Sequence, residues 1–183
     1  MGTGIWRITL ALAGILLNYE ATANNNFDVH LDKFERVGPA GEYFSYNYTY
    51  DKIADMKYNM GGHVQQHVQL DDSYMVKALM ARSELADGSE YEVMLDIEKP
   101  LCEWMRTIYK TYFYEELEKV SNFPHYDTCP LPVAEYTVTD YVFDAEPYSE
   151  MMSEGRWKTE MMLTKDGNVC SGIVMITTVK PKA

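Results

Sequence analysis

The sequence predicts a mostly β fold, a two-sheet β-sandwich or cup of about eight strands with one inserted α-helix at about residues 103–120. Two observations predict the sheets. Apolar and polar residues alternate in short runs, which is the period of half-buried strands, and turn-forming residues separate these runs. A third observation predicts the helix, because residues 103–120 contain neither Gly nor Pro.

The expected strands follow one another along the chain. In the first, Phe27, Val29 and Leu31 alternate with polar residues. Turns such as Gly38-Pro39-Ala40-Gly41 separate the strands. The remaining predicted strands are Tyr43–Tyr50, Val64–Leu70, Tyr74–Ala81, Tyr91–Ile97, Tyr136–Phe143, Trp157–Leu163 and Val169–Val179.

The predicted helix is amphipathic. At 3.6 residues per turn, one face carries apolar and aromatic side chains, although Glu116 falls within the same arc. Pro124, which follows Ser121-Asn122, ends the pattern. The residues of the apolar face are Met105, Ile108, Tyr109, Tyr112, Phe113 and Val120.

Residues 1–23 have the three parts of a secretory signal peptide. Arg7 precedes an apolar core from Ile8 to Leu17, and Ala21-Thr22-Ala23 supplies the small residues of a cleavage site. The apolar core is too short for a helix that spans a bilayer, but a buried N-terminal helix or a membrane anchor stays an alternative. The sequence therefore predicts an extracellular, secreted protein with a single domain at residues 24–183.

The charge and the motifs exclude several classes of function. A formal net charge of −12 disfavours nucleic acid and anionic lipid surfaces as partners. Nucleophile-elbow, zinc-protease, P-loop and dinucleotide motifs are missing, which argues against an enzyme and against a cofactor. His63 and His67 would share one face of a strand, but a zinc site normally needs three or four ligands, so two surface histidines are the simpler interpretation.

Secretion permits disulfides and glycosylation. The chain has three cysteines. A bridge between Cys102 and Cys129 would pin both ends of the helix, whereas the alternative is three free, buried thiols. Cys170 is expected to be a buried, unpaired core residue. Asn47 lies in the sequon Asn47-Tyr48-Thr49.

The sequon also orients one strand. If Asn47 carries a glycan, the face of the strand that holds Asn47 is exposed to solvent. The opposite face then turns inward, because side chains alternate along a strand. That inward face holds Phe44, Tyr46, Tyr48 and Tyr50. The 12 Met and 15 Tyr suit either a filled core or an adaptable apolar cavity. Trp104 and Trp157, at the starts of elements, suit either a cavity rim or ordinary core.

The order of motifs after Tyr91 resembles a known family. A strand runs through Leu95 to Cys102, followed by Tyr112-Phe-Tyr-Glu-Glu-Leu117, Ser121-Asn122-Phe-Pro, Cys129-Pro130 and Glu154-Gly155-Arg156-Trp157-Lys158. This order resembles a large insect family of secreted proteins with a lipid-recognition-like domain, and in particular the Chemosensory B (CheB) proteins, which are similar to the ganglioside activator protein. The resemblance covers about 90 C-terminal residues well and the N-terminal strands loosely.

The resemblance implies a cup that holds a lipid between its sheets, contact pheromone detection, and pairing of Cys102 with Cys129. The ganglioside activator has more disulfides than three cysteines can form, so the exact cup departs from that pattern. We expect a secreted, non-catalytic binding protein for a hydrophobic small molecule or lipid. The alternative is a modulator that docks on a receptor or ion channel ectodomain without a ligand. The expected cavity residues are Phe44, Tyr46, Tyr48, Tyr50, Trp104, Ile108, Tyr112 and Trp157.

Overall fold

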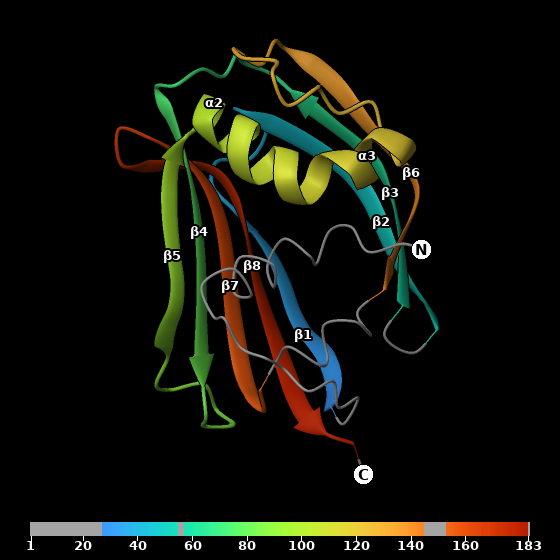
Figure 1. The fold of residues 1–183 in the computed structure, drawn as a ribbon, viewed down its shortest axis with the longest axis vertical. Helices are drawn as coiled ribbons and strands as arrows, with labels where there is room; N and C mark the ends of the chain where they lie inside the picture. Colours follow the sequence, from blue (N-terminus) through green and yellow to red (C-terminus); the bar gives the residue numbers. More distant parts are fainter. Residues whose placement is uncertain (1–26, 55–56, 145–152, 183) are drawn as a thin grey trace.

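The computed structural model describes residues 27–54, 57–144 and 153–182. It is mostly β, with two antiparallel sheets and a single helix, as the sequence predicts (Figure 1). All eight predicted strands overlap observed ones, seven of them over most of their predicted range. The strands are β1 Phe27–Val37, β2 Phe44–Ala54, β3 Lys57–Gln66, β4 Tyr74–Ser83, β5 Glu92–Pro100, β6 Ala134–Asp144, β7 Gly155–Lys165 and β8 Asn168–Pro181. The expected signal peptide lies outside the described residues.

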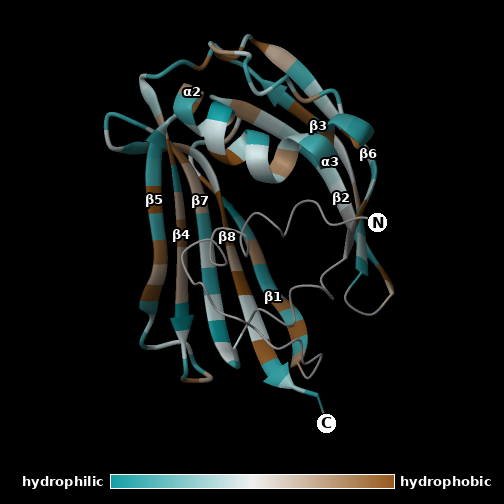
Figure 2. Ribbon diagram, in the orientation of Figure 1, coloured by the Kyte–Doolittle hydropathy of each residue, from teal (hydrophilic) through white to brown (hydrophobic). Residues whose placement is uncertain are grey.

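The two sheets are unequal. A five-stranded sheet has the order β1-β8-β7-β4-β5, and a three-stranded sheet has the order β2-β3-β6. Apolar and polar residues alternate along the strands of the larger sheet (Figure 2), which gives each strand one face for the interior. In β4 the inward row is Tyr74, Val76, Ala78 and Met80, all at most 7% exposed. This row places a packed interior on one face of the larger sheet.

The helix joins the edge of one sheet to the edge of the other. It runs without a break through α2 (Leu101–Trp104), the wider π-helical segment η1 (Met105–Tyr114) and α3 (Glu115–Val120). It begins directly after β5, and α2 contacts β4 and β5, whereas α3 contacts β6. On the opposite side, the turn after β1 leads directly into β2. The helix therefore covers one side of the space between the sheets (Figure 1).

The inward face of the helix repeats every four residues. Leu101, Met105, Tyr109 and Leu117 are buried, and Phe113 packs against the same core. Such spacing drifts around an ideal helix of 3.6 residues per turn. The wider turn of η1, which has i→i+5 hydrogen bonds, offsets this drift and keeps the row directed inward.

The expected strand Val64–Leu70 is wrong in position, because β3 spans Lys57–Gln66. The pair Gly61-Gly62 suggests a turn before the predicted strand, but both residues lie within β3. A Cβ on Gly62, where φ is +141°, would meet the Asn47 carbonyl oxygen at 2.3 Å, so the backbones of β2 and β3 approach too closely for a side chain. Beyond β3, Leu70 pairs with Leu131 in an isolated bridge.

A disulfide joins Cys102 and Cys129, so the bridge at the helix ends is confirmed. Cys102 lies in the first turn of the helix, and Cys129 lies in the segment that leads into β6. The bridge therefore ties the edge of the five-stranded sheet to the loop that enters the three-stranded sheet. In the part of the chain that is described, no helix is long and apolar enough to cross a membrane.

Candidate functional site

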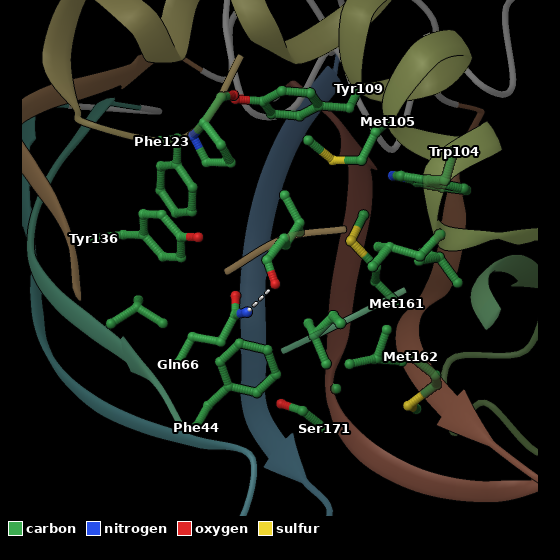
Figure 3. A pocket seen from close by; sticks show the side chains of 18 of the residues that line it. Phe44, Gln66, Trp104, Met105, Tyr109, Phe123, Tyr136, Met161, Met162 and Ser171 are labelled. Carbon is green, nitrogen blue, oxygen red and sulfur yellow. Dashed lines mark hydrogen bonds between the residues drawn. The ribbon is translucent and has the colours of Figure 1, made fainter. Parts of the chain in front are cut away.

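A cavity of about 330 Å³ lies between the two sheets and against the helix (Figure 3). Protein interiors contain few voids larger than a water molecule, so this volume is not a packing defect of ordinary size. The side chains around it are almost all apolar or aromatic. They are Phe44, Tyr46, Val64, Gln66, Leu70, Val76, Leu101, Trp104, Met105, Tyr109, Phe123, Pro124, Leu131, Tyr136, Met161, Met162, Leu163, Ser171, Gly172 and Ile173.

Each layer of the fold contributes a different kind of residue. The five-stranded sheet supplies aliphatic side chains from β4 and β7, such as Val76 and Met161. The three-stranded sheet supplies Phe44 from β2 and Tyr136 from β6, and the helix supplies the inward row that includes Tyr109. The cavity thus exists only where the helix and both sheets converge.

Gln66 is the most buried polar side chain of the lining, at 1% exposed. Its Nε2 donates to the carbonyl oxygens of Val68, Leu131 and Pro132, at 2.8, 3.2 and 2.9 Å. Buried amides require such partners. These bonds attach the segment before β6 to the end of β3, and Figure 3 shows the bonded amide at the cavity wall.

Two lining tyrosines have partners for their hydroxyls. Tyr109 donates to the Pro124 carbonyl oxygen at 3.0 Å, and the Tyr46 hydroxyl lies 2.5 Å from Ser171 Oγ. Burial raises the pKa of both tyrosines above the ordinary value, because the phenolate would lose its hydration. Both side chains therefore stay neutral over a wide range of pH.

Tyr136 differs from these two. Its side chain is 6% exposed, and the ring stacks on Phe123 with centroids 5.0 Å apart and an angle of 12° between the planes. The buried hydroxyl has no hydrogen-bond partner in the described structure. Burial raises the pKa of this tyrosine too. Figure 3 shows its oxygen directed into the cavity.

Three of the expected cavity residues, Phe44, Tyr46 and Trp104, lie in the lining. Tyr48 does not, because it lies two residues further along β2, about 7 Å away at the rise of a strand. It lines a separate, more polar recess with Phe34, Arg36, Thr49 and Asp51. The Tyr50 side chain lies outside the described part of the structure.

Ile108, Tyr112 and Trp157 are also absent from the lining. The widened helix turns Met105 and Tyr109 inward and leaves Ile108 and Tyr112 half-buried beside them. Trp157 is ordinary core, 5% exposed, and its indole N–H donates to the Ser153 carbonyl at 3.0 Å. Met161, which does line the cavity, lies four residues further along β7, about 13 Å away.

Sequence reasoning missed much of the lining. The four-residue spacing of Leu101, Met105 and Tyr109 was a signal for the helix. Met161-Met162 in a strand was a weaker one, because methionines fill irregular spaces. Gln66, Phe123 and Tyr136 had no local signal, since distant segments bring them to the cavity.

The remaining predicted residues lie away from the cavity. Asn47 is exposed on β2, which is an edge strand, and glycosylation there stays a prediction. Cys170 is buried outside the disulfide. His63 Nδ1 lies 3.2 Å from Thr137 Oγ1, and His67 Nε2 lies 2.7 Å from Ser45 Oγ. Among the described residues, no group of three metal-ligating side chains occurs.

The comparison with protein families gives one match. Residues 76–159 match the family described as "Protein of unknown function (DUF1091)". The matched segment runs from β4 through the helix and β6 to the start of β7, so it includes the disulfide and Tyr136. It also overlaps the motifs from Leu95 to Lys158 that carry the family resemblance. No curated protein matches the chain.

Proposed function

We propose that this chain is a secreted, non-catalytic binding protein for an apolar or lipid-like ligand, acting in chemosensation such as contact pheromone detection. The observation that carries the proposal is the apolar cavity of about 330 Å³ between the sheets. This volume is at the lower end of the range for small-molecule sites, about 300–1,000 Å³. The resemblance to CheB proteins supports the chemosensory part of the proposal.

The physical basis of binding is burial of apolar surface. Moving an alkyl chain from water into such a cavity gains about 25 cal/mol per Å². A ligand that binds the folded chain and not the unfolded chain also stabilises the fold by mass action. Met161 can adapt to chains of different shape because methionine is flexible and polarizable.

A cavity-filling variant tests this proposal. Val76, 7% exposed, lies in the lining on β4, and Val93 is 56% exposed on the neighbouring β5. Val76→Phe would displace roughly two ligand methylenes at about 0.8 kcal/mol each, which weakens binding about tenfold. Val93→Phe adds the same volume at the surface and is the matched control, with binding expected to equal the wild type.

The measurement is displacement of phenylnaphthylamine, a neutral fluorescent probe, from lipid-stripped protein by dodecane or dodecanol. Circular dichroism checks that both variants are folded. Binding by the wild type and by Val93→Phe, with loss in Val76→Phe, supports the proposal. If the wild type takes up neither the probe nor the chains, the carrier function is refuted and the docking alternative gains support.

A further inference from the structure

The Tyr136 hydroxyl is a hydrogen-bonding group without a bond. The residue is 94% buried when its 6% exposure is subtracted, and the hydroxyl has no partner among the described residues. Stacking on Phe123 at 5.0 Å fixes the ring, so the hydroxyl cannot simply swing out to solvent. Leaving a buried polar group unbonded is costly, whereas a partner in the cavity removes that cost.

The other hydroxyls of the lining already have partners. The Tyr109 hydroxyl donates to the Pro124 carbonyl, and the Tyr46 hydroxyl is paired with Ser171 Oγ. The Gln66 amide nitrogen donates to three backbone carbonyls. Of the lining hydroxyls in the described structure, the one of Tyr136 is therefore free for a ligand atom.

The lining also restricts the charge of that atom. None of the described lining residues is a Lys, Arg, His, Asp or Glu. The guanidinium of Arg36 stacks on the Tyr46 ring at 5.0 Å, but Arg36 is exposed and lies outside the lining. A carboxylate or phosphate buried at Tyr136 would lose its hydration with no cation to compensate. A neutral carbonyl or hydroxyl loses far less.

From these observations we infer that the cavity is selective for a chain with one neutral oxygen-containing group, such as an alcohol, an ester or a ketone, which hydrogen-bonds to the Tyr136 hydroxyl. This inference rests on the proposed function and names the chemical class of its ligand. A phenol hydroxyl both donates and accepts, so it suits either a carbonyl or a hydroxyl. The alkyl chain then extends toward Met161 and Leu163 on the opposite wall.

The test compares dodecane, dodecanol, methyl laurate and laurate on the full-length protein and on Tyr136→Phe. Phe keeps the ring that stacks on Phe123 and removes only the oxygen. Loss of one neutral hydrogen bond should weaken dodecanol and methyl laurate binding roughly 3- to 10-fold, with dodecane affinity unchanged or higher. At pH 7.5, where a carboxylic acid is ionised, laurate should bind the wild type more weakly than methyl laurate.

Two further variants keep the result specific. Tyr114→Phe makes the same change on the helix outside the lining and should bind all four compounds as the wild type does. Tyr46→Phe removes a hydroxyl already paired with Ser171 and should affect dodecanol less than Tyr136→Phe does. If Tyr46→Phe has the larger effect, the assignment to Tyr136 is overturned.

The outcomes separate the two proposals. If none of the four compounds binds the wild type, the carrier function itself fails. If they bind but Tyr136→Phe affects dodecane and dodecanol equally, the cavity stands and the hydrogen bond to the ligand is refuted. That result would indicate that the Tyr136 hydroxyl forms its hydrogen bond with a water molecule and not with the ligand. Tighter binding of laurate than of methyl laurate would overturn the preference for a neutral group and indicate Arg36 as the site of the head.

Discussion

The two walls of the cavity differ in chemistry. The wall from the five-stranded sheet, here called the aliphatic wall, is made mostly of flexible or branched apolar side chains: Val76, Met161, Leu163 and Ile173. It also includes Ser171, whose hydroxyl is paired with that of Tyr46. The facing wall, here called the aromatic wall, comes from the three-stranded sheet, the helix and the loop after it. Its aromatic residues are Phe44, Tyr46, Trp104, Tyr109, Phe123 and Tyr136.

The difference suggests separate roles for the two walls, one for the length of a bound chain and the other for the orientation of its end group. Aliphatic side chains contribute burial without direction, so under the proposed function the aliphatic wall would set the length of alkyl chain that the cavity accepts. The aromatic wall has stacked rings and three tyrosine hydroxyls, of which the one of Tyr136 has no partner among residues 27–54, 57–144 and 153–182. A change in the aromatic wall should therefore alter which end group binds, and a change in the aliphatic wall should alter which chain length binds.

The largest expected effect on stability comes from removing the disulfide that links the two walls. The disulfide joins Cys102, beside β5, to Cys129, before β6. Replacing both with Ser should lower the free energy of unfolding by about 3–4 kcal/mol, the value for a loop of this size in the chain-entropy model. Urea unfolding under oxidising conditions measures this. Cys170→Ala, which leaves the bridge intact, is the control and should cost about 1 kcal/mol.

An unchanged urea midpoint in the double variant would show that the bridge does not hold the walls together. Reducing agent provides a second check, since it should lower the stability of wild type and Cys170→Ala but leave the double variant unaffected.

A smaller effect is expected when the Tyr136 ring loses the Phe123 ring on which it stacks. Phe123→Ala removes the stacked partner of Tyr136, and a half-buried Phe should cost about 2 kcal/mol of stability, less than the ~3–5 kcal/mol of a fully buried one. The freed Tyr136 ring should also discriminate less between dodecanol and dodecane. Phe123→Leu keeps apolar contact and should fall between the wild type and Ala. Unchanged discrimination in Phe123→Ala would separate the stack from ligand selection.

The sequence predicted the strands of both walls better than it predicted where along these strands the two sheets face each other across the cavity. Period-two alternation oriented β2, and the structure has Ser45, Asn47 and Thr49 exposed and Tyr46 half-buried. Alternation gives the inward face of a strand but not the position along it at which the other sheet lies. For that reason Tyr46 lines the cavity, whereas Tyr48 faces the separate recess beside Arg36.

The helix illustrates the same limit. Its range and its flanking disulfide followed from local signals, namely the absence of Gly and Pro and the positions of Cys102 and Cys129. An assumed 3.6-residue period then placed Ile108 and Tyr112 inward together with Tyr109. Only the widened turn of η1 shows that Met105 and Tyr109 form the inward row. Tyr136 and Phe123 had no pattern of their own because their partnership depends on tertiary packing.

Within the aromatic wall, one substitution should have opposite effects at two tyrosines. Tyr109→Phe removes a hydroxyl that donates to Pro124 O at 3.0 Å and should destabilise the ligand-free protein by about 1 kcal/mol. Tyr136→Phe removes an unbonded buried hydroxyl and should stabilise it by up to about 1 kcal/mol. Thermal unfolding measures both, with a shift of about 2–4 °C per kcal/mol. Equal destabilisation by the two variants would mean that the Tyr136 hydroxyl is already satisfied without a ligand.

A change in the aliphatic wall should have its smallest effect on the choice of end group. Met161→Leu conserves volume, so stability should change by less than about 1.5 kcal/mol. Leu is stiffer than Met, so the variant should accept a narrower range of chain lengths while its ratio of dodecanol to dodecane affinity stays that of the wild type. Displacement assays with alcohols of increasing length test this. A changed ratio at constant chain length would show that both walls select the end group.

The most direct test of the account is a crystal structure of the protein with dodecanol. The alcohol oxygen is expected at hydrogen-bond distance from Tyr136 Oη, about 2.7–2.8 Å, with the chain between the sheets against Met161 and Leu163. A chain bound outside the cavity, or one inside it with the oxygen turned away from Tyr136, would contradict it.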